Sequence, residues 1–108
     1  MRILFDHGTP SGIIGSLAGH EVTEAIERAW DRISNGDLLT LAEAEKFDVL
    51  LTTDKGIRYQ QNLTGRQIAI VVLGNSTWRL VRLYLDRIAA AVDEATPGSY
   101  SEVDIPFV

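Results

Sequence analysis

The 108-residue sequence contains no cysteine and only two histidines, His7 and His20. Without cysteine there can be no disulfide, no thiolate zinc site and no cysteine nucleophile, and the composition fits a reducing compartment. Two histidines also disfavour a histidine-rich metal site. No apolar run approaches the length of about 20 residues that a membrane-spanning helix needs, and the first apolar stretch is too short for a signal peptide. We therefore expect a cytoplasmic protein that does not associate with a membrane.

The formal net charge is −5, which by itself disfavours a nucleic-acid partner. The charge is unevenly distributed, because residues 1–54 carry four basic and ten acidic side chains, whereas residues 55–87 carry six basic and one acidic. An acidic region and a basic region can face the same polyanion when metal ions neutralise the acids. Two ordinary solvated surfaces would give the same distribution, so the charge leaves both interpretations open.

Chain length and composition predict one compact domain, since 45% apolar and 23% charged residues are ordinary for a globular protein. We expect the domain to span residues 1–98 and to be followed by a tail at 99–108, packed through Ile105, Phe107 and Val108. A core of this size is modest, so a homodimer would be a natural way to bury more surface.

Apolar runs between turn residues predict four strands, at residues 2–5, 20–23, 48–52 and 67–73. Helical spacing predicts helices at about 11–17, 34–46 and 78–95. Ser34 and Asp37 have the spacing of a capping box at the start of the second of these helices, with Leu38, Leu41 and Ala42 as its buried stripe. The alternation predicts an α/β fold with a four-stranded, mainly parallel sheet flanked by helices.

Three acidic residues lie where such a fold places functional sites. Asp6 follows the first strand, Asp54 follows the third, and Asp37 begins the helix between them. Sites in parallel sheets form beyond the carboxyl ends of the strands, and converging carboxylates repel one another unless a cation lies among them. Mg²⁺ or Mn²⁺ suits oxygen ligands and promotes phosphodiester hydrolysis. Each acid also has a structural interpretation, as a turn residue for Asp6 and Asp54 and as a helix cap for Asp37.

The order of three short motifs resembles a known family. The motifs are Asp6-x-x-x-Pro10 after the opening strand, Asn35-Gly36-Asp37-Leu38-Leu39, and Leu50-Leu51-Thr52-Thr53-Asp54-Lys55. Together they resemble the small PIN-like proteins, a compact branch of the PIN-domain nucleases often found as toxins of toxin–antitoxin pairs. The resemblance implies a PIN-like fold and a Mg²⁺- or Mn²⁺-dependent ribonuclease that cleaves single-stranded RNA. It further implies Asp6, Asp37 and Asp54 as metal ligands and catalytic residues, and a cognate antitoxin protein as partner.

The polar segment after Asp54 contains the candidate substrate-binding residues. Arginine and amide side chains contact both phosphates and bases, and the expected contacts come from Lys55, Arg58, Gln60 and Asn62. Tyr59 is a candidate for stacking on an unpaired base. An ordinary surface loop with Tyr59 tucked onto the core explains the same residues equally well.

A second function remains open. Relatives of this type often carry a further acid two residues after the third one, where this chain has Gly56. The alternative is therefore a non-catalytic PIN-like interaction module that dimerises or binds a cognate small protein, in which the acids serve only caps and turns.

Overall fold

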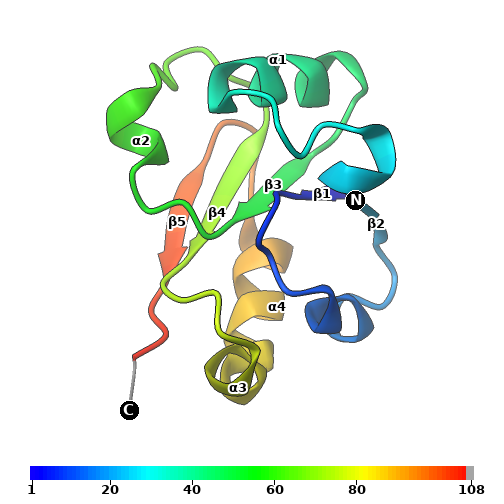
Figure 1. Ribbon diagram of the computed structural model, residues 1–108, viewed down its shortest axis with the longest axis vertical. Coiled ribbons are helices and arrows are strands. Elements are labelled where there is room, and N and C mark those ends of the chain that lie inside the picture. The colour runs from blue at the N-terminus through cyan, green and yellow to red at the C-terminus, as the bar shows by residue number, and fades with distance from the viewer. Residues whose placement is uncertain (107–108) are drawn as a thin grey trace.

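The computed structural model describes residues 1–106, which form a five-stranded sheet with helices on both faces (Figure 1). Along the sheet the strands lie in the order β2-β1-β3-β4-β5, and every neighbouring pair is parallel. Their bounds are Arg2–Phe5 (β1), Glu21–Glu24 (β2), Val49–Thr52 (β3), Ala69–Leu73 (β4) and Tyr100–Val103 (β5). The structure confirms the expected single compact α/β domain with a parallel sheet.

The predicted number of strands was wrong, because the expected tail contributes β5. This strand pairs in parallel with β4 and forms one edge of the sheet. Its sequence, Tyr-Ser-Glu-Val, has no apolar run, and only Val103 among its residues is buried. An edge strand needs less apolar surface than a central one, so the pattern gave no strand signal. Ile105 is buried as expected, whereas Phe107 and Val108 lie outside the described residues.

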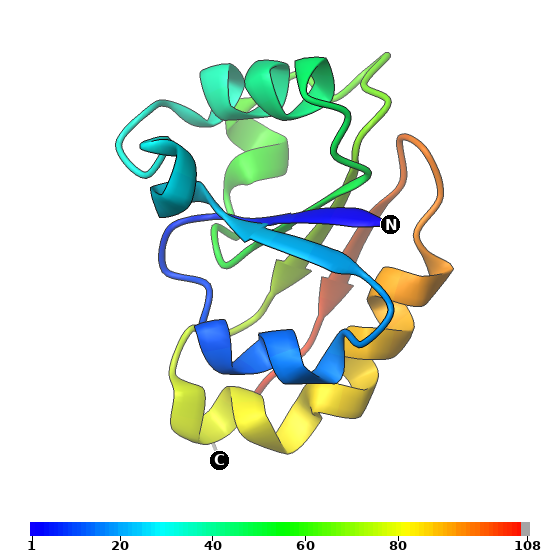
Figure 2. The same ribbon diagram turned by 90° about the vertical axis from the view of Figure 1, so that its right-hand side faces the viewer.

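Two layers of helices cover the sheet (Figure 2). One layer contains α1 (Asn35–Ala44) and α2 (Ile57–Gln60), whose apolar side chains pack with Leu4 and Leu50. The other contains the 3₁₀ helix η1 (Ser11–Ser16) and the segment α3 (Trp78–Val81), η3 (Arg82–Tyr84) and α4 (Leu85–Glu94). A further 3₁₀ turn, η2 (Ala25–Arg28), follows β2. The single helix expected at 78–95 is thus interrupted by the tighter turn η3.

Ser34 caps the start of α1 as expected, but only this half of the predicted capping box forms, and the buried face differs slightly. The Ser34 hydroxyl accepts a hydrogen bond from the backbone N–H of Asp37 at 3.2 Å, which caps the helix. Leu38 and Ala42 are buried as expected, together with Leu39, whereas Leu41 is 37% exposed. The inward face is therefore centred on positions 38, 39 and 42, because the rotation of the helix against the sheet is set by packing.

Strand register brings the ends of β1 and β3 together. Phe5 pairs with Leu51, so the residues that follow, Asp6 and Thr52, stand side by side at the carboxyl edge of the sheet. Side chains alternate along a strand, and Leu50 packs on the α1 face while Leu51 packs on the opposite one. The side chains of Asp6 and Thr52 therefore emerge on the face covered by α1.

Candidate functional site

Asp6 is held at the end of β1 by hydrogen bonds to β3 and to the turn that follows it. Its backbone N–H donates to the carbonyl of Leu51 at 2.9 Å, which continues the pairing with β3 by one residue. Its carboxylate Oδ2 accepts from the Thr52 hydroxyl at 2.7 Å, and Oδ1 accepts from the backbone N–H of His7 at 2.8 Å. The Asp6 carboxylate is therefore fixed by β3 on one side and by its own turn on the other.

Asp54 lies just beyond β3 and shares a partner with Asp6. Its backbone N–H donates to the Thr52 hydroxyl at 3.1 Å, while its Oδ1 accepts from the N–H of Gly56 at 2.9 Å. The amide of Asn35, at the start of α1, donates to Oδ2 at 2.6 Å. The buried Thr52 hydroxyl thus connects both acids, and we call Asp6, Asn35, Thr52 and Asp54 the carboxyl-edge site.

The third predicted acid, Asp37, is exposed in the first turn of α1. This turn also carries Asn35, so Asp37 comes from the element that contacts Asp54. The cap of α1 is the Ser34 side chain, which accepts from the Asp37 backbone N–H, and the metal-binding role of Asp37 stays a prediction. Sequence reasoning missed Asn35 and Thr52, although an Asn that opens a helix and a Thr that ends an apolar strand are signals that could have identified them.

The side chains of the carboxyl-edge site offer the type of ligand atom, oxygen, that a hard divalent cation prefers. Two carboxylates, an amide oxygen and a hydroxyl are oxygen ligands, and Mg²⁺ is often held by only one or two carboxylates because it retains several waters. Among residues 1–106 no group of three or more His, Cys, Asp or Glu side chains is arranged to hold a metal ion. The structure thus joins Asp6 and Asp54 through Thr52, and a metal ion shared by these acids and Asp37 stays a prediction.

Beside this site, α2 presents an arginine between two tyrosines. Arg58 donates to the Tyr59 hydroxyl at 2.5 Å, and its guanidinium lies 4.7 Å from the centre of the Tyr59 ring and 5.5 Å from that of Tyr100. Tyr59 is 76% exposed, which contradicts the interpretation that it is tucked onto the core. Burial, followed by a hydrogen bond from its hydroxyl to Glu102, raises the pKa of Tyr100 to about 12. Tyr100 is thus a neutral neighbour of Arg58 at ordinary pH.

The other predicted substrate-binding residues differ in their surroundings. Lys55 is exposed next to Asp54 and lines a hollow of about 530 Å³ with Gly74, Glu102 and Asp104 at the carboxyl ends of β4 and β5. Gln60 is exposed at the end of α2. The side chain of Asn62 accepts from the N–H of Thr64 at 3.1 Å, which is a turn contact and favours the loop interpretation for that residue.

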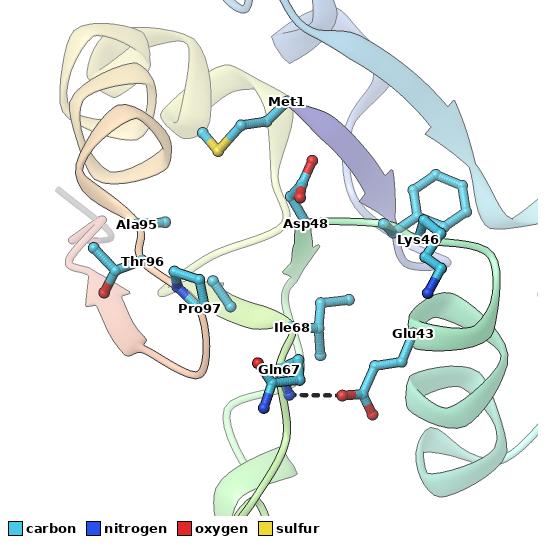
Figure 3. A pocket seen from close by; sticks show the side chains of 11 residues that line it. Met1, Glu43, Lys46, Asp48, Gln67, Ile68, Ala95, Thr96 and Pro97 are labelled. Carbon is cyan, nitrogen blue, oxygen red and sulfur yellow. Dashed lines mark hydrogen bonds between the residues drawn. The ribbon is translucent and has the colours of Figure 1, made fainter.

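A second hollow, of about 330 Å³, lies at the amino ends of the strands (Figure 3). Lys46, Asp48 and Pro97 contribute to its walls, and Glu43 there accepts the backbone N–H of Gln67 at 2.7 Å. Asp48 immediately precedes β3, whereas Asp54 follows it. This hollow is therefore on the opposite edge of the sheet and is separate from the carboxyl-edge site.

Comparison with protein-family models, curated protein sequences and solved structures found no match for this chain. Within residues 1–106 no helix combines the length and the apolar character that crossing a membrane requires.

Proposed function

We propose that the protein is a PIN-like, metal-dependent ribonuclease that hydrolyses phosphodiester bonds of single-stranded RNA. The observation that carries this proposal is the pairing of Asp6 and Asp54 through the Thr52 hydroxyl at the carboxyl edge of two adjacent central strands. Functional sites of parallel α/β sheets form at this edge. In keeping with the resemblance of its motifs, we assign it as a toxin whose partner is a cognate antitoxin protein.

The cation would be held by Asp6 and Asp54, with Asp37 available from the first turn of α1. When bound, Mg²⁺ or Mn²⁺ stabilises negative charge on a phosphoryl oxygen and lowers the pKa of water. Thr52 and Asn35 act as positioning residues, because their hydrogen bonds fix one carboxylate oxygen each of Asp6 and Asp54. Both carboxylates are thus oriented before any ligand arrives, which is the arrangement that electrostatic catalysis requires.

Positive charge on the α2 side of the site would contact the RNA. Lys55 directly follows Asp54, and Arg58 projects from α2 beside the exposed ring of Tyr59. A lysine and an arginine here bind phosphates, and Tyr59 offers a stacking surface to an unpaired base. In-line hydrolysis of this type leaves a 5′-phosphate and a 3′-hydroxyl.

The decisive experiment compares metal-dependent cleavage of an end-labelled single-stranded RNA by wild type, Asp6→Asn and Asp54→Asn. We expect each variant to lose on the order of a hundredfold or more of activity, because each substitution removes a charged oxygen ligand. Asp48→Asn, at the other end of β3, is the matched control and should retain activity. Unchanged metal-dependent cleavage by both site variants would refute the proposal.

One observation favours the alternative, a non-catalytic interaction module. All four carboxylate oxygens of Asp6 and Asp54 already accept hydrogen bonds from this chain, so the acids are satisfied as turn residues. Calorimetric titration with Mn²⁺ separates the two functions. Binding that disappears in Asp6→Asn supports the nuclease, whereas no heat of binding at any Mn²⁺ concentration supports the interaction module.

A further inference from the structure

A second basic surface lies on the face of the sheet opposite α2. Six residues of the segment 78–87 are exposed, including the acidic Asp86, which lies one turn after Arg82. We call the other five the α3 arginine face: Trp78, Arg79, Arg82, Leu83 and Arg87. Residues three or four apart are neighbours on a helical surface, so Trp78 adjoins Arg82, and Arg79 adjoins both Arg82 and Leu83. The surface is therefore continuous rather than a set of scattered charges.

The arginines of this face are not used to stabilise the fold. The ion pairs found among residues 1–106 involve Arg2, His20, Arg28 and Arg66, and none involves Arg79, Arg82 or Arg87. Arg87 lies over the ring of Tyr84 at 5.3 Å, and Asp86 is the only acidic residue between positions 78 and 87. The guanidinium groups of Arg79 and Arg82 are thus available to an external anion.

This face also adjoins the carboxyl edge of the sheet. β4 ends at Leu73 and α3 begins at Trp78, so α3 follows directly from that edge. The Trp78 ring packs against Gly12 of η1, the first element after Asp6. Figure 2 shows α3 and η1 together on one side of the sheet, with α1 and α2 on the other. The carboxyl-edge site consequently lies between two basic surfaces.

We propose that single-stranded RNA crosses the carboxyl edge from α2 to α3, with Arg79 and Arg82 binding phosphates on the far side of the scissile bond. This inference rests on the proposed ribonuclease function and extends it to a second half of the substrate path. Each half carries an exposed aromatic residue near an arginine, with the Tyr59 ring under Arg58 and the 41% exposed Trp78 one helical turn before Arg82. Aromatic stacking combined with phosphate contacts is the usual mode of single-strand recognition, and it favours RNA over an acidic protein segment.

The salt dependence of RNA binding tests the contacts directly. Each phosphate contact on a single strand contributes about 0.7 to the slope of log affinity against log salt. Loss of either Arg79 or Arg82 should therefore lower the slope by roughly that amount. Weaker binding without a change in slope would indicate a structural effect instead.

The experiment measures fluorescence anisotropy of a labelled single-stranded RNA over a range of salt concentrations, with Ca²⁺ replacing Mg²⁺ and intact RNA verified afterwards on a gel. Arg79→Gln and Arg82→Gln are suitable variants because both positions are exposed and glutamine has nearly the helix propensity of arginine. Lys46→Gln is the matched control, since it removes the same charge from the hollow at the amino edge (Figure 3).

We expect both arginine variants to bind several-fold more weakly with a reduced slope, and Lys46→Gln to match wild type. If all three variants lose the same affinity, only overall charge matters and the α3 path is refuted, while the ribonuclease function stands. If wild type binds no RNA at all, both the path and the ribonuclease function are refuted. If Arg79→Gln and Arg82→Gln bind RNA as wild type does, the α3 path is refuted.

Discussion

The carboxylate of Asp6 accepts a hydrogen bond from the hydroxyl of Thr52 at 2.7 Å, although the two residues are 46 positions apart in the sequence. The same hydroxyl oxygen accepts the backbone N–H of Asp54 at 3.1 Å. One buried side chain therefore ties together the two acids on which the proposed function depends. Because these hydrogen bonds contribute to stability, the arrangement of the carboxyl-edge site can be tested by unfolding measurements that need no substrate.

Replacing Thr52 with valine removes this hydroxyl while keeping nearly the same shape. We expect Thr52→Val to lower the free energy of unfolding by about 1–3 kcal/mol, because the Asp6 carboxylate and the Asp54 N–H each lose a partner. Urea denaturation measures the change. Thr53→Val, at the next and less buried position, is the control and should change stability by less than about 0.5 kcal/mol. Equal effects at both positions would show that the Thr52 hydroxyl makes no special contribution.

Substituting Asn35 with aspartate tests whether the site accepts a cation. The new carboxylate would replace the amide that lies 2.6 Å from Asp54, so repulsion should lower stability in EDTA by on the order of 1–2 kcal/mol. Mn²⁺ should then raise the melting temperature of the variant more than that of wild type. Asn62→Asp, in the exposed loop, should show neither effect. A variant that is destabilised in EDTA and does not respond to Mn²⁺ would argue against a metal at this edge.

Glu43 gives a prediction about pH. Burial disfavours its charged form, but hydrogen bonds from Arg66 at 2.6 Å and from the Gln67 N–H at 2.7 Å outweigh burial and hold its pKa below 4.5. When folding lowers the pKa of a carboxyl group, that group stabilises the folded state at any pH above its pKa in the unfolded chain. This contribution disappears as the pH falls through its lower pKa in the folded protein. Glu43→Gln should therefore destabilise by about 1–2 kcal/mol at neutral pH.

Denaturation curves of wild type and Glu43→Gln at a series of pH values check this expectation. The difference in stability should shrink as the pH falls from 4.5 through the lower folded pKa. Glu94→Gln, at the exposed end of α4, should differ from wild type by less than about 0.5 kcal/mol throughout. A stability difference for Glu43→Gln that persists undiminished in acid would mean that the charge of Glu43 is not its source.

Two glycines of η1 form an internal comparison. A Cβ at Gly12 would lie 2.5 to 2.8 Å from three atoms of the Trp78 ring, whereas a Cβ at Gly15 meets nothing within 4 Å. Gly12→Ala should displace the ring, change the tryptophan fluorescence and destabilise by about 1 kcal/mol. Gly15→Ala should stabilise by about 0.4–1 kcal/mol, since alanine restricts the unfolded chain. If Gly12→Ala were as stable as Gly15→Ala, the Trp78 ring would not pack closely against Gly12, and the inferred contact between η1 and α3 would be contradicted.

The sequence alone determined the class of fold. The apolar runs at β3 and β4 favoured strands covered on both faces, and the Ser34 hydroxyl could cap a helix using local contacts alone. Such signals lie within a few consecutive residues, so they can be recognised in the sequence without knowledge of the tertiary structure. The positions of Asp6 and Asp54 after strands were readable for the same reason.

Tertiary structure alone decided how those parts meet. β5 exists because β4 offers it an edge to pair with, not because its own four residues are apolar. Thr52 joins the site only because the register of β1 against β3 places it beside Asp6. Contacts between residues 19 or 46 positions apart depend on register, packing and helix rotation, which are properties of the whole fold. The sequence therefore indicated Asp6 and Asp54 as candidate site residues, and the fold determined that they form a pair of acids joined by a threonine.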